Sequence, residues 1–175
     1  MNEYRDHEMI KMINDNDVTV SELSKKSYYQ QTAAGVLNIV WCDQGILESS
    51  FVDAEAIPPN EDCCQFKQFI FTNYGTLPLI VSGTDFQKSV WQRMVISRVG
   101  EVLTYKQVAE EIGKPAAVRA VGSALGKNRH ACLIPCHRAV RSDGGLGGFR
   151  WGVKRKSHLL QLETDGLDLV QQILV

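Results

Sequence analysis

The chain has 175 residues, of which 44% are hydrophobic and 22% are charged, so it can bury one full core or two small ones packed together. The first residues, 1–17, are mixed and polar, unlike a secretion signal, and no apolar run approaches membrane-spanning length. We therefore expect a globular cytoplasmic protein with no membrane partner.

The cysteines are odd in number and lack paired Cys-x-x-Cys spacing, which argues against a disulfide scaffold and a zinc site. They are Cys42, Cys63, Cys64, Cys132 and Cys136. Most cysteines in a reducing compartment are small buried hydrophobes, and only Cys136 has neighbours that indicate reactivity. We expect no metal and no cofactor.

The net charge of −1 hides an asymmetry between two parts of the chain. Residues 1–82 carry 5 basic and 12 acidic residues, whereas residues 83–175 carry 14 and 8. Within residues 114–158, ten basic residues stand against Asp143 alone. Such a cluster can be an ordinary solvated face, but its size favours a polyanionic partner.

The first part of the chain predicts a small α/β layer. A helix is expected over Met9–Ile13, and two strands, Ala34–Cys42 and Ile46–Val52, are expected to form a hairpin. Apolar residues at helical spacing predict a helix over Glu61–Tyr74, and Leu77–Val81 is typical of one more strand.

The second part predicts short helices with clear boundaries. Thr84–Gln87 and Thr104–Gln107 have the pattern of capping boxes, in which each threonine hydroxyl and each glutamine side chain satisfies a free amide. The second of these helices should stop at Gly113 and Pro115. Together the two parts predict an α+β fold with domains over 1–82 and 83–175.

A third helix is expected over Ala116–Leu125, with valines on its buried side. Its opposite face carries Arg119 among the small residues Gly122, Ser123 and Gly126, so it could approach another backbone closely. Two helices joined by a short link form a helix-turn-helix. On this feature alone, a packed helix pair with a surface arginine fits equally well.

A reactive constellation follows this helix. The apolar run Ala131–Ile134 is expected to be a strand that delivers Pro135-Cys136-His137-Arg138, and glycines within 144–148 predict a tightly turned loop. A free thiol has a pKa of about 8.5, and neighbouring cations lower it. Either His137 or a base acting through water could take the thiol proton.

Two other chemistries fit this constellation poorly. Cysteine hydrolases recruit a histidine from far along the chain and need an oxyanion site, for which the sequence shows no pattern. Zinc deaminases need a second cysteine three residues after the first, where this chain has Ala139.

The motif Ile134–Arg138 is similar to the active-site motif of the O6-alkylguanine-DNA alkyltransferases. The likeness extends from Gly83 to Glu163 and includes "TYKQVAEEIGKPAAVRAVGSALGKN", "LIPCHRAV" and "GFRWGVKRKSHLLQLE". Residues 34–82 are similar to the looser N-terminal domain of that family. The resemblance, to bacterial members in particular, implies a ribonuclease H-like N-terminal domain and a winged helix-turn-helix domain.

The resemblance also implies roles for individual residues. Cys136 would accept the alkyl group, His137 would act as a base through a water, and Glu163 would orient His137. Asn128 would brace the active-site segment, and Tyr105 would donate a hydrogen bond to the guanine. Arg119 would enter the base stack, and the remaining DNA-binding residues would be Ala120, Ser123 and Lys127.

Four residues would line or close the substrate pocket: Ala139, Phe149, Arg150 and Trp151. The family often has tyrosine where this chain has Phe149, and many relatives have glycine in place of Trp151. We expect the indole to narrow the pocket, so that methyl lesions react readily and O6-benzylguanine reacts poorly.

The predicted activity is a single, irreversible transfer of an alkyl group from O6-alkylguanine, and also from O4-alkylthymine, in double-stranded DNA to Cys136. We expect a monomer. The alternative is a helix-turn-helix regulator or lesion sensor without catalysis. The tail Thr164–Val175 could form a final helix or serve a contact.

Overall fold

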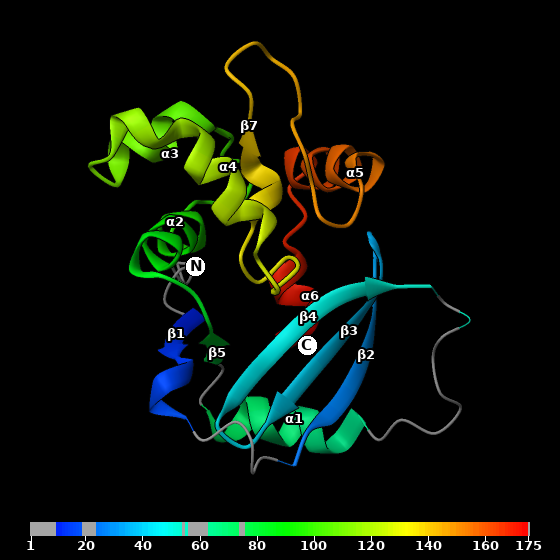
Figure 1. The fold of residues 1–175 in the computed structure, drawn as a ribbon. Helices are drawn as coiled ribbons and strands as arrows, with labels where there is room; N and C mark the ends of the chain where they lie inside the picture. The colour runs from blue at the N-terminus through cyan, green and yellow to red at the C-terminus, as the bar shows by residue number, and fades with distance from the viewer. Residues whose placement is uncertain (1–9, 19–23, 54, 56–62, 74–75, 175) are drawn as a thin grey trace, which may run out of the picture.

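The computed structural model describes residues 10–18, 24–53, 55, 63–73 and 76–174. It is an α+β fold in which a five-stranded sheet lies beside a group of short helices (Figure 1). None of the helices in these ranges is both long and apolar enough to cross a membrane.

The sheet has the strand order β1-β5-β4-β3-β2. The strands are β1 Ile10–Asn14, β2 Lys26–Thr32, β3 Gly35–Cys42, β4 Gly45–Val52 and β5 Leu77–Val81. The neighbours β2, β3 and β4 are antiparallel, whereas β5 runs parallel to both β1 and β4. The predicted hairpin and the predicted last strand are therefore confirmed.

Two features of the sheet differ from the prediction. The helix expected over Met9–Ile13 is wrong over Ile10–Ile13, because Ile10 begins a strand whose partner is Leu77 in β5; Met9 lies outside the described residues. A short apolar run does not distinguish the two periodicities, so the available sheet edge decides between them. Strand β2 was not predicted, since its sequence Lys26–Thr32 is mostly polar and only Tyr28 and Thr32 are buried.

Helix α1, Cys63–Thr72, packs on the sheet through aromatic side chains. The ring of Phe66 stacks on Tyr28 at 4.5 Å and meets Trp41 edge-on at 5.6 Å. The predicted helical face is confirmed in this range. The ends of the predicted helix, at Glu61 and Tyr74, lie outside the described residues.

The second part of the chain is mostly helical (Figure 1). Its helices are α2 Asp85–Val95, α3 Tyr105–Glu111, α4 Val118–Gly126, α5 Val153–Thr164 and α6 Leu169–Leu174. Helices α2 and α5 contact the turn that carries Cys136, whereas α6 lies beside the sheet. Both predicted capping boxes, at Thr84 and Thr104, are confirmed by reciprocal hydrogen bonds. A short parallel pair, β6 Leu103–Thr104 and β7 Ala139–Val140, joins the start of α3 to the segment after the motif.

The segment before the motif is a turn, so the strand predicted over Ala131–Ile134 is wrong. The amide of Leu133 donates to the carbonyl of Ala131 at 2.7 Å, and Cys132 has a left-handed backbone with φ 63°. All four side chains are buried. The run is therefore apolar because it packs in the core, and pairing with a neighbouring strand is not the reason.

The tail forms a final helix, α6, which packs against β2. Leu169 and Ile173 are buried, and the amide of Ala33 donates to the side chain of Gln172 at 3.2 Å. The helical alternative for the tail is thus confirmed. Because α6 follows α5 directly, it ties the sheet to the helices around the motif.

Candidate active site

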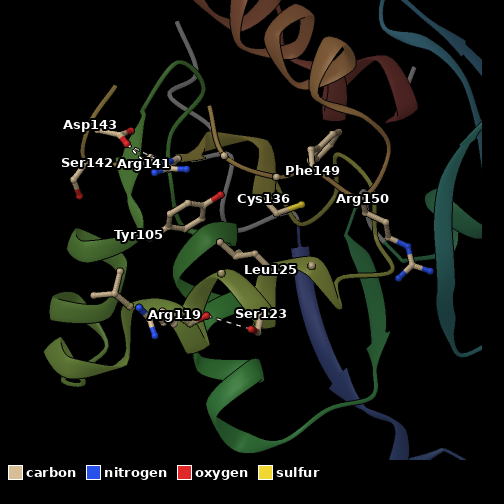
Figure 2. A pocket seen from close by; sticks show the side chains of 15 residues that line it. Tyr105, Arg119, Ser123, Leu125, Cys136, Arg141, Ser142, Asp143, Phe149 and Arg150 are labelled. Atoms are coloured by element: carbon tan, nitrogen blue, oxygen red, sulfur yellow. Dashed lines mark hydrogen bonds and ion pairs between the residues drawn. The ribbon is translucent and has the colours of Figure 1, made fainter. Parts of the chain in front are cut away.

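A pocket of about 920 Å³ reaches Cys136 between α3, α4 and the loop after β7 (Figure 2). Its lining combines small residues of α4, the phenol of α3 and residues of the loop. The lining is Tyr105, Val118, Arg119, Gly122, Ser123, Leu125, Gly126, Cys136, Arg141, Ser142, Asp143, Gly147, Gly148, Phe149 and Arg150.

Cys136 begins a 3₁₀ turn, Cys136–Arg138, and only 5% of it is exposed. The amide of Asn128 donates to Sγ of Cys136 at 3.2 Å and to the carbonyl of Ile134 at 3.0 Å. Its oxygen accepts from the amide of His130 at 2.8 Å. Asn128 therefore connects the end of α4 to the turn and donates a hydrogen bond to the sulfur itself.

His137 and Glu163 form a buried pair. Nε2 of His137 lies 2.7 Å from Oε1 of Glu163. An ionised carboxylate only accepts hydrogen bonds, so in the neutral ring Nε2 carries the proton and Nδ1 keeps its lone pair. Nδ1 is buried and has no hydrogen-bond partner among the described residues. His137 can therefore act as a proton acceptor.

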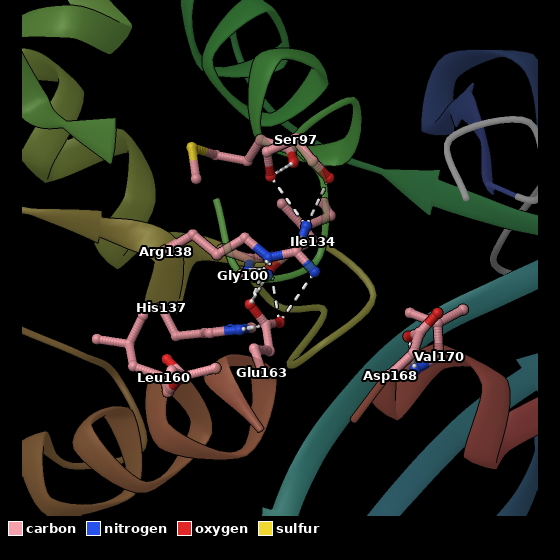
Figure 3. Close-up of polar contacts among 12 residues, drawn as sticks. Ser97, Gly100, Ile134, His137, Arg138, Leu160, Glu163, Asp168 and Val170 are labelled. Carbon is pink, nitrogen blue, oxygen red and sulfur yellow. Dashed lines mark hydrogen bonds and ion pairs between the residues drawn. The ribbon is translucent and has the colours of Figure 1, made fainter. Parts of the chain in front are cut away.

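Arg138 holds the carboxylate from the other side (Figure 3). Its Nε donates to Oε2 of Glu163 at 2.9 Å, and its Nη2 donates to Oε1 at 2.9 Å. Its Nη1 donates to the carbonyl of Ser97 at 2.6 Å, and the amide of Gly100 donates to Glu163 at 3.1 Å. The Glu163 carboxylate and the Arg138 guanidinium are thus satisfied by several partners each, which offsets the cost of burying their charges.

Burial and charge set the ionisation of the site. Burial raises the pKa of the Cys136 thiol to about 11, although the Asn128 amide and the Lys156 ammonium act in the opposite direction. Burial lowers the pKa of His137, so its ring is neutral at physiological pH. Burial alone would raise the pKa of Glu163, but hydrogen bonds from His137 and Arg138 outweigh it and bring the pKa to about 2.

The sequence indicates Arg138 only as a cation next to the thiol, and it gives no sign that Arg138 pairs with Glu163 or that Lys156 belongs to the site. Lys156 was counted only as part of a basic surface, yet it is 0% exposed. A usable signal was present, because Lys156, Leu159 and Glu163 follow the spacing of one helical face. If Glu163 faces His137, this spacing places Lys156 on the buried side as well.

Tyr105, the first residue of α3, brings a phenol to the pocket (Figure 2). Burial raises the pKa of Tyr105, which keeps it protonated and able to donate. Gly147 has φ 72°, and a Cβ there would lie 2.3 Å from the Tyr105 hydroxyl. The loop can approach the phenol this closely only because position 147 has no side chain.

The predicted DNA-binding residues lie on the exposed side of α4. Arg119 and Ser123 line the pocket, and the Ser123 hydroxyl donates to the carbonyl of Arg119 at 3.2 Å. Ala120 and Lys127 are exposed outside the lining. Arg119 and Ser123 are thus exposed, and with the small residues Gly122 and Gly126 they form the α4 side of the pocket.

The structure separates the four predicted pocket residues. Phe149 and Arg150 line the pocket, whereas Ala139 is fully buried behind it. Trp151 lies outside the lining; it meets the Phe149 ring edge-on at 5.2 Å and borders a second hollow beside Ala34. The expectation that Trp151 narrows the pocket is corrected accordingly, because its indole packs behind Phe149.

Within the described ranges, no three His, Cys, Asp or Glu side chains gather as a metal ion would require. The site combines a buried thiol, a His–carboxylate pair and a pocket beside the exposed side of α4. A thiol beside a His–carboxylate pair at a pocket is the arrangement typical of proteins with a nucleophilic cysteine.

Residues 85–165 match the family described as "6-O-methylguanine DNA methyltransferase, DNA binding domain". This segment therefore belongs to that family, and the resemblance predicted from the motifs is confirmed. The segment contains every residue of the site described above.

The chain is 54% identical over 90 residues to the "Bifunctional transcriptional activator/DNA repair enzyme Ada" of Escherichia coli, covering 51% of this chain and 25% of that protein. It is 50% identical over 91 residues to the "Methylated-DNA--protein-cysteine methyltransferase" of Methanosarcina barkeri, covering 52% and 58%. The chain thus spans between a quarter and just over half of these two curated relatives.

The solved structure of Mycobacterium tuberculosis OGT in complex with DNA is similar over 86% of this chain and 99% of that chain. The TM-score is 0.64 and the sequence identity is 26%. This likeness includes the sheet as well as the helices, so the two chains have the same overall arrangement.

Proposed function

We propose that this protein repairs DNA by transferring the alkyl group of O6-alkylguanine, and of O4-alkylthymine, to Sγ of Cys136. The observation that carries the proposal is the Cys136 thiol at the pocket, with the His137–Glu163 pair behind it and the exposed face of α4 in front. The names of the relatives, which include methylated-DNA–protein-cysteine methyltransferase, support the same activity.

The chemistry follows from the groups present. Nδ1 of His137 receives the thiol proton, directly or through water, and the thiolate attacks the alkyl carbon. The bond between that carbon and O6 breaks as the S–C bond forms, and its electron pair stays on the guanine. The Tyr105 hydroxyl donates a hydrogen bond to the guanine anion, which then takes up a proton from solvent, while the imidazolium of His137 returns its proton to solvent. The product is a thioether, which does not hydrolyse at neutral pH, so each molecule acts once.

The substrate must leave the base stack, because Cys136 is only 5% exposed and lies at the pocket. Flipping a nucleotide costs a few kcal/mol, and an inserted side chain can fill the gap. We assign this task to Arg119, which is exposed and lines the pocket, and we assign backbone contacts to the exposed residues Ala120, Ser123 and Lys127. This assignment treats α3 and α4 as a winged helix-turn-helix and the sheet as ribonuclease H-like.

We further propose that the protein acts as a monomer in the cytoplasm. One chain holds the thiol, the base, the carboxylate and the exposed helix, so a single copy completes the site.

The test is incubation with a duplex oligonucleotide that carries one O6-methylguanine, followed by intact mass spectrometry and peptide mapping. We expect the protein to gain the mass of one methylene group, located on Cys136, at one equivalent per molecule. Cys136→Ala should bind the duplex with nearly unchanged affinity and gain no mass.

Each other outcome would indicate a different function or a different acceptor residue for this protein. Binding without any mass gain in the wild type would indicate a lesion sensor or regulator. Turnover of more than one equivalent without a stable adduct would indicate a hydrolase. Transfer that persists in Cys136→Ala would show that another cysteine is the acceptor.

A further inference from the structure

A lysine side chain is fully buried beside the candidate acceptor. Lys156 lies in the first turn of α5 and is 0% exposed. None of the ion pairs between described residues involves it. A buried ammonium without a carboxylate is costly for folding, so its presence calls for a role in the active protein.

The ammonium joins two segments that border the pocket. Nζ of Lys156 donates to the carbonyl of Ala139 at 2.5 Å and to the carbonyl of Gly148 at 3.2 Å. Ala139 follows the turn that carries Cys136, and Gly148 belongs to the pocket wall. One side chain therefore connects the segment that carries Cys136 to the loop that lines the pocket.

The positive charge of Lys156 also acts on the groups around Cys136. Three titratable groups interact with the ammonium. Cys136 and His137 in the 3₁₀ turn are within range of its charge, and the ring centroid of Tyr105 lies 5.8 Å from Nζ. The positive charge lowers the pKa of the Cys136 thiol and lowers the pKa of His137. It thus favours the thiolate and keeps the imidazole neutral before it accepts a proton.

We propose that Lys156 is a positioning residue that locks the pocket loop to the acceptor turn and supplies the positive charge facing the Cys136 thiolate. The roles are separable, because the tether needs only a hydrogen-bond donor whereas the thiolate needs a charge. The proposal rests on Cys136 being the acceptor, but its charge component can be measured without any DNA substrate.

The titration of Lys156 itself provides a signature. Burial lowers the pKa of Lys156 to about 8. The cation is therefore present below this pH and is lost above it. Loss of the cation raises the pKa of the Cys136 thiol, because the positive charge no longer stabilises the thiolate. Above pH 8 the reactivity of Cys136 should therefore rise less steeply with pH than that of a thiol with a constant pKa.

The experiment measures the rate of iodoacetamide labelling at Cys136 by peptide mapping, from neutral to alkaline pH. The variants are Lys156→Gln, Lys156→Arg and a matched control, Lys154→Gln, which changes an exposed lysine of the same helix. We expect Lys156→Gln to label about tenfold more slowly at neutral pH, equivalent to one unit in the thiol pKa. Lys156→Arg should keep the neutral rate and remove the alkaline flattening, because arginine stays charged.

The control should match the wild type throughout. If Lys156→Gln labels with the pH profile of the wild type, or is slower by the same factor at every pH, the charge role is wrong. If Lys156→Gln does not fold, the wild-type profile decides, since a simple single-thiol titration through pH 8 would overturn the proposal. Methyl transfer from the oligonucleotide is measured separately, so its absence would refute the proposed function and leave the labelling result intact.

Discussion

Apolar side chains fill most of the interior of the sheet region, residues 10–81, whereas the helical region, residues 85–174, also buries many polar and charged groups. Among the described residues of the sheet region, the buried polar ones are Thr32 and Ser49. Those of the helical region are Ser97, Asn128, His130, His137, Arg138, Lys156 and Glu163. The first interior is held by packing and the second by a specific set of hydrogen bonds and charges.

Similarity to other proteins also differs between the sheet region and the helical region. The family match covers residues 85–165, while structural likeness to the Mycobacterium tuberculosis protein covers 86% of this chain at 26% identity. An apolar interior tolerates exchange of side chains when volume and pattern are kept. A buried charge network does not, because each donor needs its own acceptor. The sheet region can therefore keep its fold while its sequence changes.

The largest effect is expected from Glu163→Ala, which removes the carboxylate between His137 and Arg138. Breaking a buried ion pair from one side costs about 3–5 kcal/mol of unfolding free energy, because Arg138 stays buried and unpaired. Methyl transfer should also slow about a hundredfold or more, since His137 loses its anchor. Urea unfolding and single-turnover rates measure the two losses.

The matched change in the sheet region is Leu37→Ala, at a side chain that is 0% exposed. The cavity should cost about 2–5 kcal/mol, a similar loss of stability. The transfer rate per folded molecule should stay at the wild-type value. If Leu37→Ala slowed transfer as much as Glu163→Ala, the division between packing and chemistry would fail.

The next effect concerns His130, whose Nε2 lies 3.1 Å from the carbonyl of Ile80 at the junction of the two regions. Burial lowers the pKa of His130 to about 4, whereas an unfolded histidine titrates near 6.5. Between these values the unfolded chain binds more protons, so stability falls with decreasing pH by about 3 kcal/mol. His130→Gln should remove most of this loss in urea unfolding across that range.

The residual slope in His130→Gln would come from His137, whose pKa is also lowered by burial. An unchanged pH dependence would mean that His130 takes up its proton without disturbing the junction. Glu163 does not interfere in most of this window, because its pKa of about 2 makes its contribution vary mainly at lower pH.

A smaller effect is expected from Arg119→Ala. This change tests whether the excess of basic residues in the helical region, compared with the acidic sheet region, serves DNA repair. Transfer from duplex DNA should fall about tenfold, roughly 1.4 kcal/mol, because flipping loses its support. Transfer from the free modified base should be unchanged. Lys11→Ala, an exposed lysine in β1, is the control and should affect neither substrate. Equal losses on both substrates would show that Arg119 does not assist flipping.

The smallest effect is expected from Trp151→Gly in the reaction with O6-benzylguanine. Because Trp151 lies outside the pocket lining, the rate should stay within about twofold of the wild type. Phe149→Ala is the comparison, and it should slow the reaction several-fold because a benzyl ring would lose an aromatic contact. A large acceleration in Trp151→Gly would restore the steric role first expected for the indole.

The sequence by itself determined the local features of the helical region. Both capping boxes form as predicted, because their hydrogen bonds join residues three positions apart. The turn between β3 and β4 and the acceptor motif were also visible, since each occupies a few consecutive residues. The resemblance then named Asn128, His137 and Glu163, which the structure brings together around Cys136.

Only the tertiary structure decided the features that depend on distant partners. Ile10 belongs to a strand because β5 offers an edge 67 positions along the chain, and the apolar run 131–134 turns because the core surrounds it. Lys156 is buried because α5 packs its inner face on the motif, and Trp151 misses the pocket because its ring packs behind Phe149. Burial and partner choice are set by the whole fold, so short-range patterns do not specify them.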